Sequence, residues 1–504
     1  MSALFFDERA LVHSNELRRV LGLWSVVAFG VTNEIAAGLF FVSTQIQQTA
    51  PGVGDLVPWL MIVGGVLTFA TVIAYRYFFA SGLVGAGGEY VIISRAVNPF
   101  FGFLATFLSW FGVSGSLGTL AYTAPKFLAN ACDALGAAGA AQVLGSTAGT
   151  IVTGLVLLWG IWFVHVRGVR LAGTLAVVAM CFVIVVALVV IGYGFSTTPE
   201  TFGLALQSRL HVSVQHVLAA APVAHVNAAV AFGTALPVLF FGYLGLSTAT
   251  QTGAEAVDAR RALSKGVVIA VCLVMFIYTL FAFAVYHAVP WRLIAGLSAL
   301  KFTTYTTSTG LLGMVMPPWL ASLMNVFVAL IVIKTFLPLY LAQSRWIYAW
   351  AQDGLLPSRF AVTHVRFQTP VLALTIAAVL GSLTLAESIP MGYVFGVQVR
   401  VLACMIVFFF LGLGMWLFPR TAPADYAGNQ SAIARNRPVQ IAVGAIIMGF
   451  STWFAISICV SSLDKPVFLQ PAVQAVIVAL LGIAIYAFRS GSSRRAAAIP
   501  APES

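Results

Sequence analysis

The chain is a succession of long apolar segments separated by short polar connections. A helix needs about 20 predominantly apolar residues to cross a bilayer, and these segments reach that length without the alternation typical of barrel strands. We therefore predict twelve membrane-spanning helices. They cover residues 21–47, 57–79, 99–123, 148–166, 171–194, 231–253, 266–288, 318–349, 369–386, 397–418, 439–461 and 469–488.

The first apolar segment carries polar residues at its centre. Threonine, asparagine and glutamate stand at residues 32–34, between Gly30 and Gly38. A carboxylate such as that of Glu34 is costly to place in hydrocarbon, so it usually faces a partner, a cavity or a solute path. The flanking glycines make the helix easy to unwind, and unwound backbone can bind a solute. The pattern predicts a broken helix around which a solute transporter is built.

The sixth apolar segment repeats this signature. Residues 240–248 again place glycines and small polar residues in the middle of the membrane. The first and sixth segments are five crossings apart, so they run in opposite directions. Two glycine-interrupted helices in inverted positions indicate the binding site of a secondary transporter.

Composition agrees with a membrane protein. Of the 504 residues, 60% are hydrophobic and 8% are charged, whereas soluble domains have roughly 25% charged residues. The net charge of +11 does not indicate nucleic-acid binding here, because cytoplasmic loops of membrane proteins collect Lys and Arg. If the N-terminus is inside, 19 of the 26 basic residues face the cytoplasm and 5 the outside, with Lys334 and Arg400 inside segments. Both termini are therefore predicted to be cytoplasmic.

Other chemistry has little support in the sequence. The five cysteines and seven histidines show no metal-ligand spacing, so no disulfide framework, metal site or cofactor is expected. No nucleophile–base motif supports an enzyme. Loops poor in glycosylation motifs favour a prokaryotic inner membrane, and the chain is expected to be a monomer or a homodimer.

Three stretches carry a family resemblance. Residues 87–103 contain GGEYVIISRA followed by NPFFGF, residues 245–261 run from a glycine-containing helix into an acidic-then-basic loop, and residues 344–357 contain SR and AQDGLLP. In this order they resemble the second-to-third helix loop, the sixth helix and the eighth-helix exit of the amino acid–polyamine–organocation (APC) superfamily. The chain is thus similar to an amino acid permease.

The resemblance implies an all-α, LeuT-like fold with two inverted five-helix repeats and two extra C-terminal helices. It also implies alternating access and a substrate that carries an amine. The implied organisation is a cytoplasmic N-terminus (1–20), a first repeat (21–194), an extracellular connection (195–230), a second repeat (231–418), two C-terminal helices (439–488) and a cytoplasmic tail (489–504).

The resemblance also implies a substrate site at the two breaks. Backbone N–H groups of the first helix would hold a carboxylate, carbonyls of the first and sixth helices would hold the ammonium, and aromatic residues of the sixth helix would form a gate. Carried over by position, the substrate-binding residues are Thr32, Asn33, Ala36, Ala37, Gly38, Gly112, Val113, Ser116, Phe241, Tyr243 and Gly245.

The sequence departs from the family pattern at several of these positions. Thr32, Ala36 and Ala37 stand where the family usually has glycine or small residues, and their Cβ atoms narrow the approach of a carboxylate to the backbone. Ile331 and Val332 replace eighth-helix hydroxyl residues that could hold sodium, so sodium coupling is not expected. The fifth-helix lysine of some proton-coupled members aligns with a valine, Val183.

Glu34 and Lys334 are the candidate coupling residues. Glu34 stands where the family usually has an apolar residue, and it could exchange a proton or anchor an ammonium; the alternative is a structural glutamate. Lys334 lies four residues before Pro338, which leaves its carbonyl without a helical partner. A Glu34–Lys334 pair that substitutes for a bound cation is one hypothesis, and a lysine that snorkels to the interface is the other. We interpret Arg400 as an outer-edge residue of the tenth helix.

The loop after the sixth helix contains a cluster of charges. Glu255, Asp258, Arg260 and Arg261 are interpreted as a cytoplasmic gate. A solvated loop is the alternative, because exposed ion pairs contribute little.

The sequence as a whole predicts a secondary active transporter for an amino acid or related small amine, either proton-linked or an exchanger. The alternative substrate is a cationic amine or polyamine anchored by Glu34. A different functional class is a transporter-like sensor or a channel. The sequence shows no signalling domain, which a sensor would need, and no filter motif, which a channel would need. The expected partners are the bilayer, the small-molecule substrate and a proton.

Overall fold

The computed structural model describes residues 16–36, 38–50, 52–222, 225–391, 397–429 and 431–497. Within these ranges the chain is an all-helical bundle, and twelve of its helical segments are long and apolar enough to cross a membrane. Each of the twelve overlaps one predicted segment, so the predicted number and order of spans are confirmed.

The helices have the following bounds: α1 (Leu23–Glu34), α2 (Gly38–Thr49), α3 (Val57–Ala80), α4 (Glu89–Ala96), α5 (Pro99–Ala134), α6 (Ala138–Gly145), α7 (Thr147–Val166), α8 (Val169–Ser196), α9 (Pro199–Leu210), α10 (Val214–Ala220), α11 (Ala228–Val230), α12 (Leu236–Leu239), α13 (Ser247–Thr250), α14 (Ala259–Ala288), α15 (Trp291–Ala299), α16 (Ser308–Gly313), α17 (Pro318–Lys334), α18 (Phe336–Gln352), α19 (Val371–Met391), α20 (Val397–Thr421), α21 (Pro423–Ala427), α22 (Arg437–Val460) and α23 (Pro471–Ala497).

The first and sixth spans are the irregular ones, as the glycine pattern predicts. The first span is divided into α1 and α2. The sixth begins as α11, continues through a π turn (Ala231–Ala235) and α12, passes into a 3₁₀ helix (Phe240–Leu246) and ends as α13. The 3₁₀ segment has the hydrogen-bonding pattern of a tighter helix, which changes the direction of the side chains along it.

Local sequence explains where other helices begin. The Asn98 side chain accepts a hydrogen bond of 2.9 Å from the Phe100 N–H, and Pro99 is the first residue of α5. An asparagine cap followed by proline is a strong helix start. It sets the sharp turn from α4 into α5, the 36-residue helix that packs against α17, α19 and α20.

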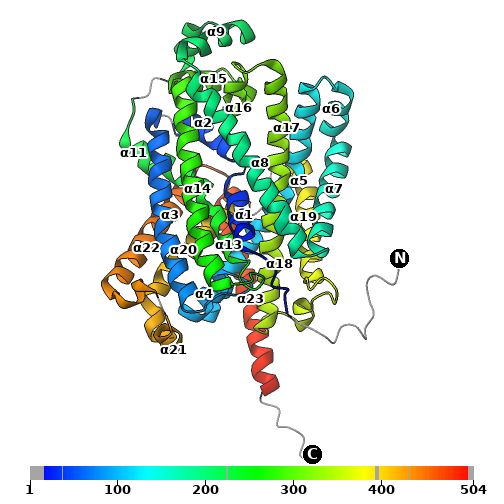
Figure 1. Cartoon of the computed structure of the whole chain (residues 1–504), viewed down its shortest axis with the longest axis vertical. Coiled ribbons are helices and arrows are strands. Elements are labelled where there is room, and N and C mark those ends of the chain that lie inside the picture. Colours follow the sequence, from blue (N-terminus) through cyan, green and yellow to red (C-terminus); the bar gives the residue numbers. More distant parts are fainter. Residues whose placement is uncertain are drawn as a thin grey trace, which may run out of the picture.

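The centre of the bundle is α1. Every residue from 26 to 34 is buried, and α1 packs against α8, α14 and the 3₁₀ segment of the sixth span. Figure 1 shows α4, α21 and the last turns of α23 at one end of the bundle and α6, α9 and α15 at the other. We call these the α4 end and the α9 end. By the charge argument, the α4 end is the predicted cytoplasmic side.

Candidate functional site

The break in the first span lies between Glu34 and Gly38. The Ile35 N–H still donates to Val31 O (2.8 Å), but the Ala36 N–H turns back to Glu34 O at 2.8 Å. The Tyr278 hydroxyl donates to the same Glu34 carbonyl (2.5 Å). The predicted unwinding of this helix is therefore present in the structure, although Ala37 lies outside the described residues.

Lys334 fills the break from the side of α17. Its Nζ donates to Thr32 O at 2.5 Å and to Ile35 O at 2.8 Å, and the side chain is buried. These are carbonyls that the interruption of α1 leaves without helical partners. Within the described part of the chain Lys334 makes no ion pair with Glu34. The predicted Glu34–Lys334 pair is wrong, and so is the snorkelling alternative, because the ammonium binds backbone carbonyls inside the bundle.

The Glu34 carboxyl group points toward the sixth and seventh spans. Its Cγ lies against Gly245, and Tyr243 and Tyr278 are its electrostatic neighbours. The Leu246 N–H is close by, yet neither carboxyl oxygen has a hydrogen bond of good geometry among the described residues. A carboxylate without such bonds is costly to bury, so Glu34 stands out as a buried acid without a satisfying partner.

A cavity of about 210 Å³ lies where the two broken spans meet α5 and α20. The Asn33 Nδ2 bridges the breaks by donating to Gly245 O at 3.3 Å. Phe241, at the cavity wall, is 40% exposed. The lining residues are Asn33, Glu34, Ala36, Gly38, Ser116, Thr119, Leu120, Phe241, Gly242, Leu244, Gly245, Thr335 and Arg400.

Six of the predicted substrate residues line this cavity, and four other described ones do not. The Thr32 hydroxyl donates to Ala28 O inside α1. Gly112 packs on the backbone of α20, where an added Cβ would lie 2.5 Å from the Arg400 Cα. Val113 lines a neighbouring, smaller cavity. The prediction of Tyr243 as a gate is wrong, because its ring is buried and its hydroxyl donates to Met61 O at 2.7 Å.

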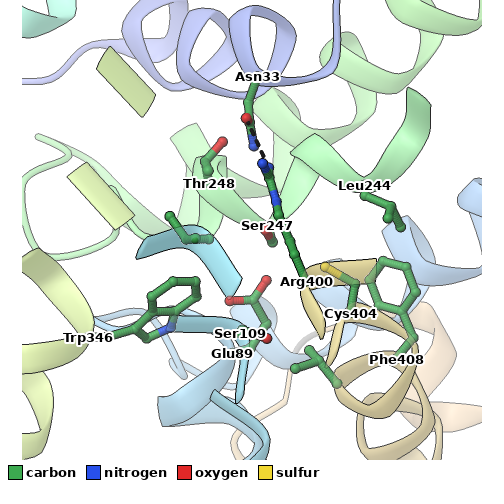
Figure 2. A pocket seen from close by; sticks show the side chains of 12 residues that line it. Asn33, Glu89, Ser109, Leu244, Ser247, Thr248, Trp346, Arg400, Cys404 and Phe408 are labelled. Carbon is green, nitrogen blue, oxygen red and sulfur yellow. Dashed lines mark hydrogen bonds between the residues drawn. The ribbon is translucent and has the colours of Figure 1, made fainter. Parts of the chain in front are cut away.

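Arg400 is the main residue that the sequence interpretation misplaced. Instead of lying at the outer edge, its side chain reaches the central cavity from the first turn of α20. Its two terminal nitrogens donate to Ser116 Oγ and Asn33 Oδ1, both at 3.3 Å. Figure 2 shows the guanidinium directed at Asn33. The only signal in the sequence was a charge inside a predicted apolar segment.

A second, smaller cavity of about 20 Å³ shares Asn33, Leu244 and Arg400 with the first. This space can hold about one water molecule. Figure 2 shows Glu89 on its far side from Asn33. The contact between Arg400 and Asn33 therefore forms part of the wall between the central cavity and a small space that Glu89 lines.

Glu89 is a buried acid that the sequence interpretation placed in a loop. It begins α4, and its two oxygens accept hydrogen bonds from the Tyr75 hydroxyl (3.0 Å) and the Gln251 side chain (2.9 Å). Burial raises the pKa of Glu89 to about 7, although these hydrogen bonds oppose the shift. Arg400 and Cys404 line the same small cavity.

We predict that ionisation of Glu89 weakens the closed arrangement of the α4 end. The pKa of Glu89 is about 7 when it is buried, against 4.5 in water. Below pH 4.5 Glu89 is therefore protonated in both the folded and the unfolded protein, and its burial carries no ionisation penalty. The loss in the free energy of unfolding grows as the pH rises from 4.5 and levels off above pH 7. It reaches roughly 3 kcal/mol if unfolding exposes Glu89 fully to water. Thermal unfolding from pH 5 to 8 should show falling stability in the wild type and a flatter profile in Glu89→Gln. An unchanged profile in Glu89→Gln would contradict this assignment, and the exposed Glu200→Gln serves as control.

Buried contacts around Glu255 join separate chain segments at the α4 end. Its carboxylate forms a two-point ion pair with Arg345 at 2.6 and 3.0 Å, and both side chains are at most 1% exposed. Its carbonyl accepts from the N–H groups of Val20 and Leu21, just before α1. On the surface nearby, Arg95 pairs with Asp353 at 2.8 Å.

The predicted gate cluster is corrected by these contacts. Glu255 pairs with Arg345 of α18 rather than with the basic residues beside it in sequence. Asp258 caps α14 by accepting from the Arg261 N–H at 3.2 Å, and Asp258, Arg260 and Arg261 are exposed. Of the four predicted gate residues, Glu255 alone takes part in these buried contacts.

Comparisons with known proteins agree with this geometry. The sequence profile described as amino acid permease matches residues 21–487. An uncharacterized transporter of Mycobacterium tuberculosis is 27% identical over 384 residues, which cover 74% of this chain and 76% of that protein. The Asc-type amino acid transporter 1 of Mus musculus is 25% identical over 367 residues, 71% of this chain and 63% of that protein. The vacuolar cationic amino acid transporter 4 of Arabidopsis thaliana is 31% identical over 134 residues, 27% of this chain and 21% of that protein.

Proposed function

The chain belongs to the amino acid permease family, and we propose that it moves an amino acid or related small amine across the membrane by alternating access. The observation that carries the proposal is the central cavity at the meeting point of the two broken spans. Interrupted helices expose backbone groups that can bind both the carboxylate and the ammonium of a zwitterion. The amino-acid class also agrees with the name of the Mus musculus relative.

Alternating access is supported by the buried contacts at the α4 end, which can act as one gate of the cycle. At the α4 end, the buried Glu255–Arg345 pair and the backbone contacts of Leu21 hold the chain segments together. We infer a state whose cavity is shut off from the predicted cytoplasmic side, and rearrangement of the Glu255 contacts would open it.

We propose that transport is independent of sodium. Lys334 Nζ binds Thr32 O and Ile35 O, so a side-chain amino group already occupies the carbonyls that the break exposes. Ile331 and Val332, on the same helix, offer apolar side chains rather than hydroxyl ligands. Such a site favours proton coupling or exchange over symport with a metal cation.

Glu34 is our candidate for proton coupling. Its carboxyl group is buried without a satisfying hydrogen bond among the described residues, and buried intramembrane acids are mostly functional. The alternative of Glu34 as an anchor for a cationic amine is less well supported, because Arg400 places a positive charge in the cavity. Like charges disfavour a dicationic substrate there.

The test is uptake of radiolabelled amino acids into proteoliposomes that contain the purified protein. We expect uptake or exchange of at least one amino acid, unchanged when sodium is replaced by choline. Glu34→Gln should abolish uptake driven by a pH gradient while equilibrium exchange continues, and the exposed Glu200→Gln should behave as wild type. Uptake that requires sodium would overturn the proposed role of Lys334, and absence of any amino acid flux would overturn the function.

A further inference from the structure

The guanidinium of Arg400 lines the central cavity without an acidic partner. No carboxylate of the described residues lies within ion-pairing distance of it. Its hydrogen bonds go to the neutral oxygens of Ser116 and Asn33, and both are long at 3.3 Å. Arginine forms its strongest contacts with two oxygens of one carboxylate, so these neutral contacts leave much of its binding capacity unused.

The backbone at the break offers less to an anion than a glycine-rich turn would. The Ala36 N–H is already used by Glu34 O. Gly38 is the first residue of α2, so its N–H has no partner inside that helix. The Gly38 N–H is therefore a backbone donor for a substrate carboxylate, whereas the Leu39 N–H is used by Ala36 O. The Arg400 guanidinium lines the same cavity and supplies the positive charge that these neutral donors lack.

We propose that Arg400 is the carboxylate anchor of the substrate site. The proposal rests on the proposed amino-acid transport and adds which residue binds the carboxylate of the substrate. A carboxylate in the cavity would replace Ser116 and Asn33 as acceptors and form a two-point, charge-assisted pair with the guanidinium. The carboxylate is either the α-carboxylate of any amino acid or the side-chain carboxylate of an acidic one, and both make the same contact.

The first test changes the ligand rather than the protein. Thermal stabilisation of the purified wild type would be compared for L-alanine, L-leucine, L-glutamate and L-glutamine, and for alaninamide and leucinamide, in which an amide replaces the α-carboxylate. We expect binding at least about tenfold weaker when an amide replaces the carboxylate that Arg400 contacts. If that is the α-carboxylate, alaninamide and leucinamide bind more weakly than alanine and leucine; if it is the side-chain carboxylate, glutamine binds more weakly than glutamate. Equal binding of acid and amide, together with equal binding of glutamate and glutamine, would overturn the proposal without touching the transport function.

The second test changes the charge. Arg400→Gln should weaken amino-acid binding by about 10- to 100-fold, the range for hydrogen bonds to charged groups, and Arg400→Lys should recover part of the loss. The exposed Arg292→Gln, which removes one positive charge elsewhere, should bind as wild type. Loss of every amino acid in Arg400→Gln assigns the contact to the α-carboxylate, and loss of glutamate alone assigns it to the side chain. Wild-type affinities in Arg400→Gln would overturn the proposal. If the wild type bound no amino acid at all, the proposed function itself would fail, and Arg400 with it.

Discussion

Lys334→Met is expected to stop transport. The substitution removes the ammonium that binds Thr32 O and Ile35 O and leaves two buried carbonyls without donors. A hydrogen bond from a charged group contributes about 1.5–3 kcal/mol. Loss of both bonds therefore costs about 3 kcal/mol or more. This lowers the population of the conformation that shapes the cavity by roughly 100-fold or more. Proteoliposome uptake should fall by at least that factor.

Controls for this prediction separate a local effect from general misfolding. Lys465 is exposed, and Lys465→Met should leave uptake unchanged. Lys334→Arg keeps the charge but adds a planar head that a compact two-carbonyl site does not match, so it should also lose most activity while the fold survives. Full uptake by Lys334→Met would show that the ammonium is dispensable and would remove the argument for sodium independence.

The sequence predicts the membrane framework well because length and apolarity decide it. Twelve segments were long enough to span the bilayer, and each overlaps a long helical span among the residues that the structure describes. The interruption after Glu34 was also predictable, because the carboxylate of Glu34 and the nearby glycines conflict with a plain lipid-facing helix. These features depend on local composition, which is visible in one chain.

Contacts between distant residues were not predictable in the same way. Arg400 lies three residues into α20, so a small error in the depth of that helix moves its guanidinium from the interface into the cavity. Helix tilt and depth are set by packing against neighbours, not by segment length. Phe241 and Tyr243 are two residues apart, yet one lines the cavity and the other is buried against α14. Residues two apart point to different sides of a helix, and packing against neighbouring helices decides which side faces the cavity.

The contacts of Glu89 could not be predicted from the sequence either, because it lies in a predicted loop. Its polar neighbours and the preceding glycines indicate a connection outside the membrane. In the structure α4 folds back into the bundle, and Glu89 contacts residues from the second and sixth spans. Lys334 was singled out from the sequence as half of a pair with Glu34, but its partners are the backbone carbonyls of Thr32 and Ile35, which side-chain identities do not reveal.

Arg345→Gln should be the most damaging change at the α4 end. It removes one half of the buried pair with Glu255, in which both side chains are at most 1% exposed, and leaves an ionised acid without its counter-charge. Removing one partner of a buried ion pair costs about 3–5 kcal/mol. We expect a large fall in the thermal unfolding temperature and a shift toward forms in which this end is open.

The same end of the bundle provides a matched control. Arg95 pairs with Asp353 at 2.8 Å, but the two side chains are 39% and 30% exposed, and surface pairs contribute about 0–1 kcal/mol. Arg95→Gln should therefore change the unfolding temperature little. The double variant Glu255→Gln with Arg345→Gln should recover part of the loss, because two neutral amides bury no unpaired charge. If Arg345→Gln and Arg95→Gln were equally mild, the Glu255–Arg345 pair would not be what holds the α4 end closed, and the closure would have to come from the backbone contacts of Val20 and Leu21 alone.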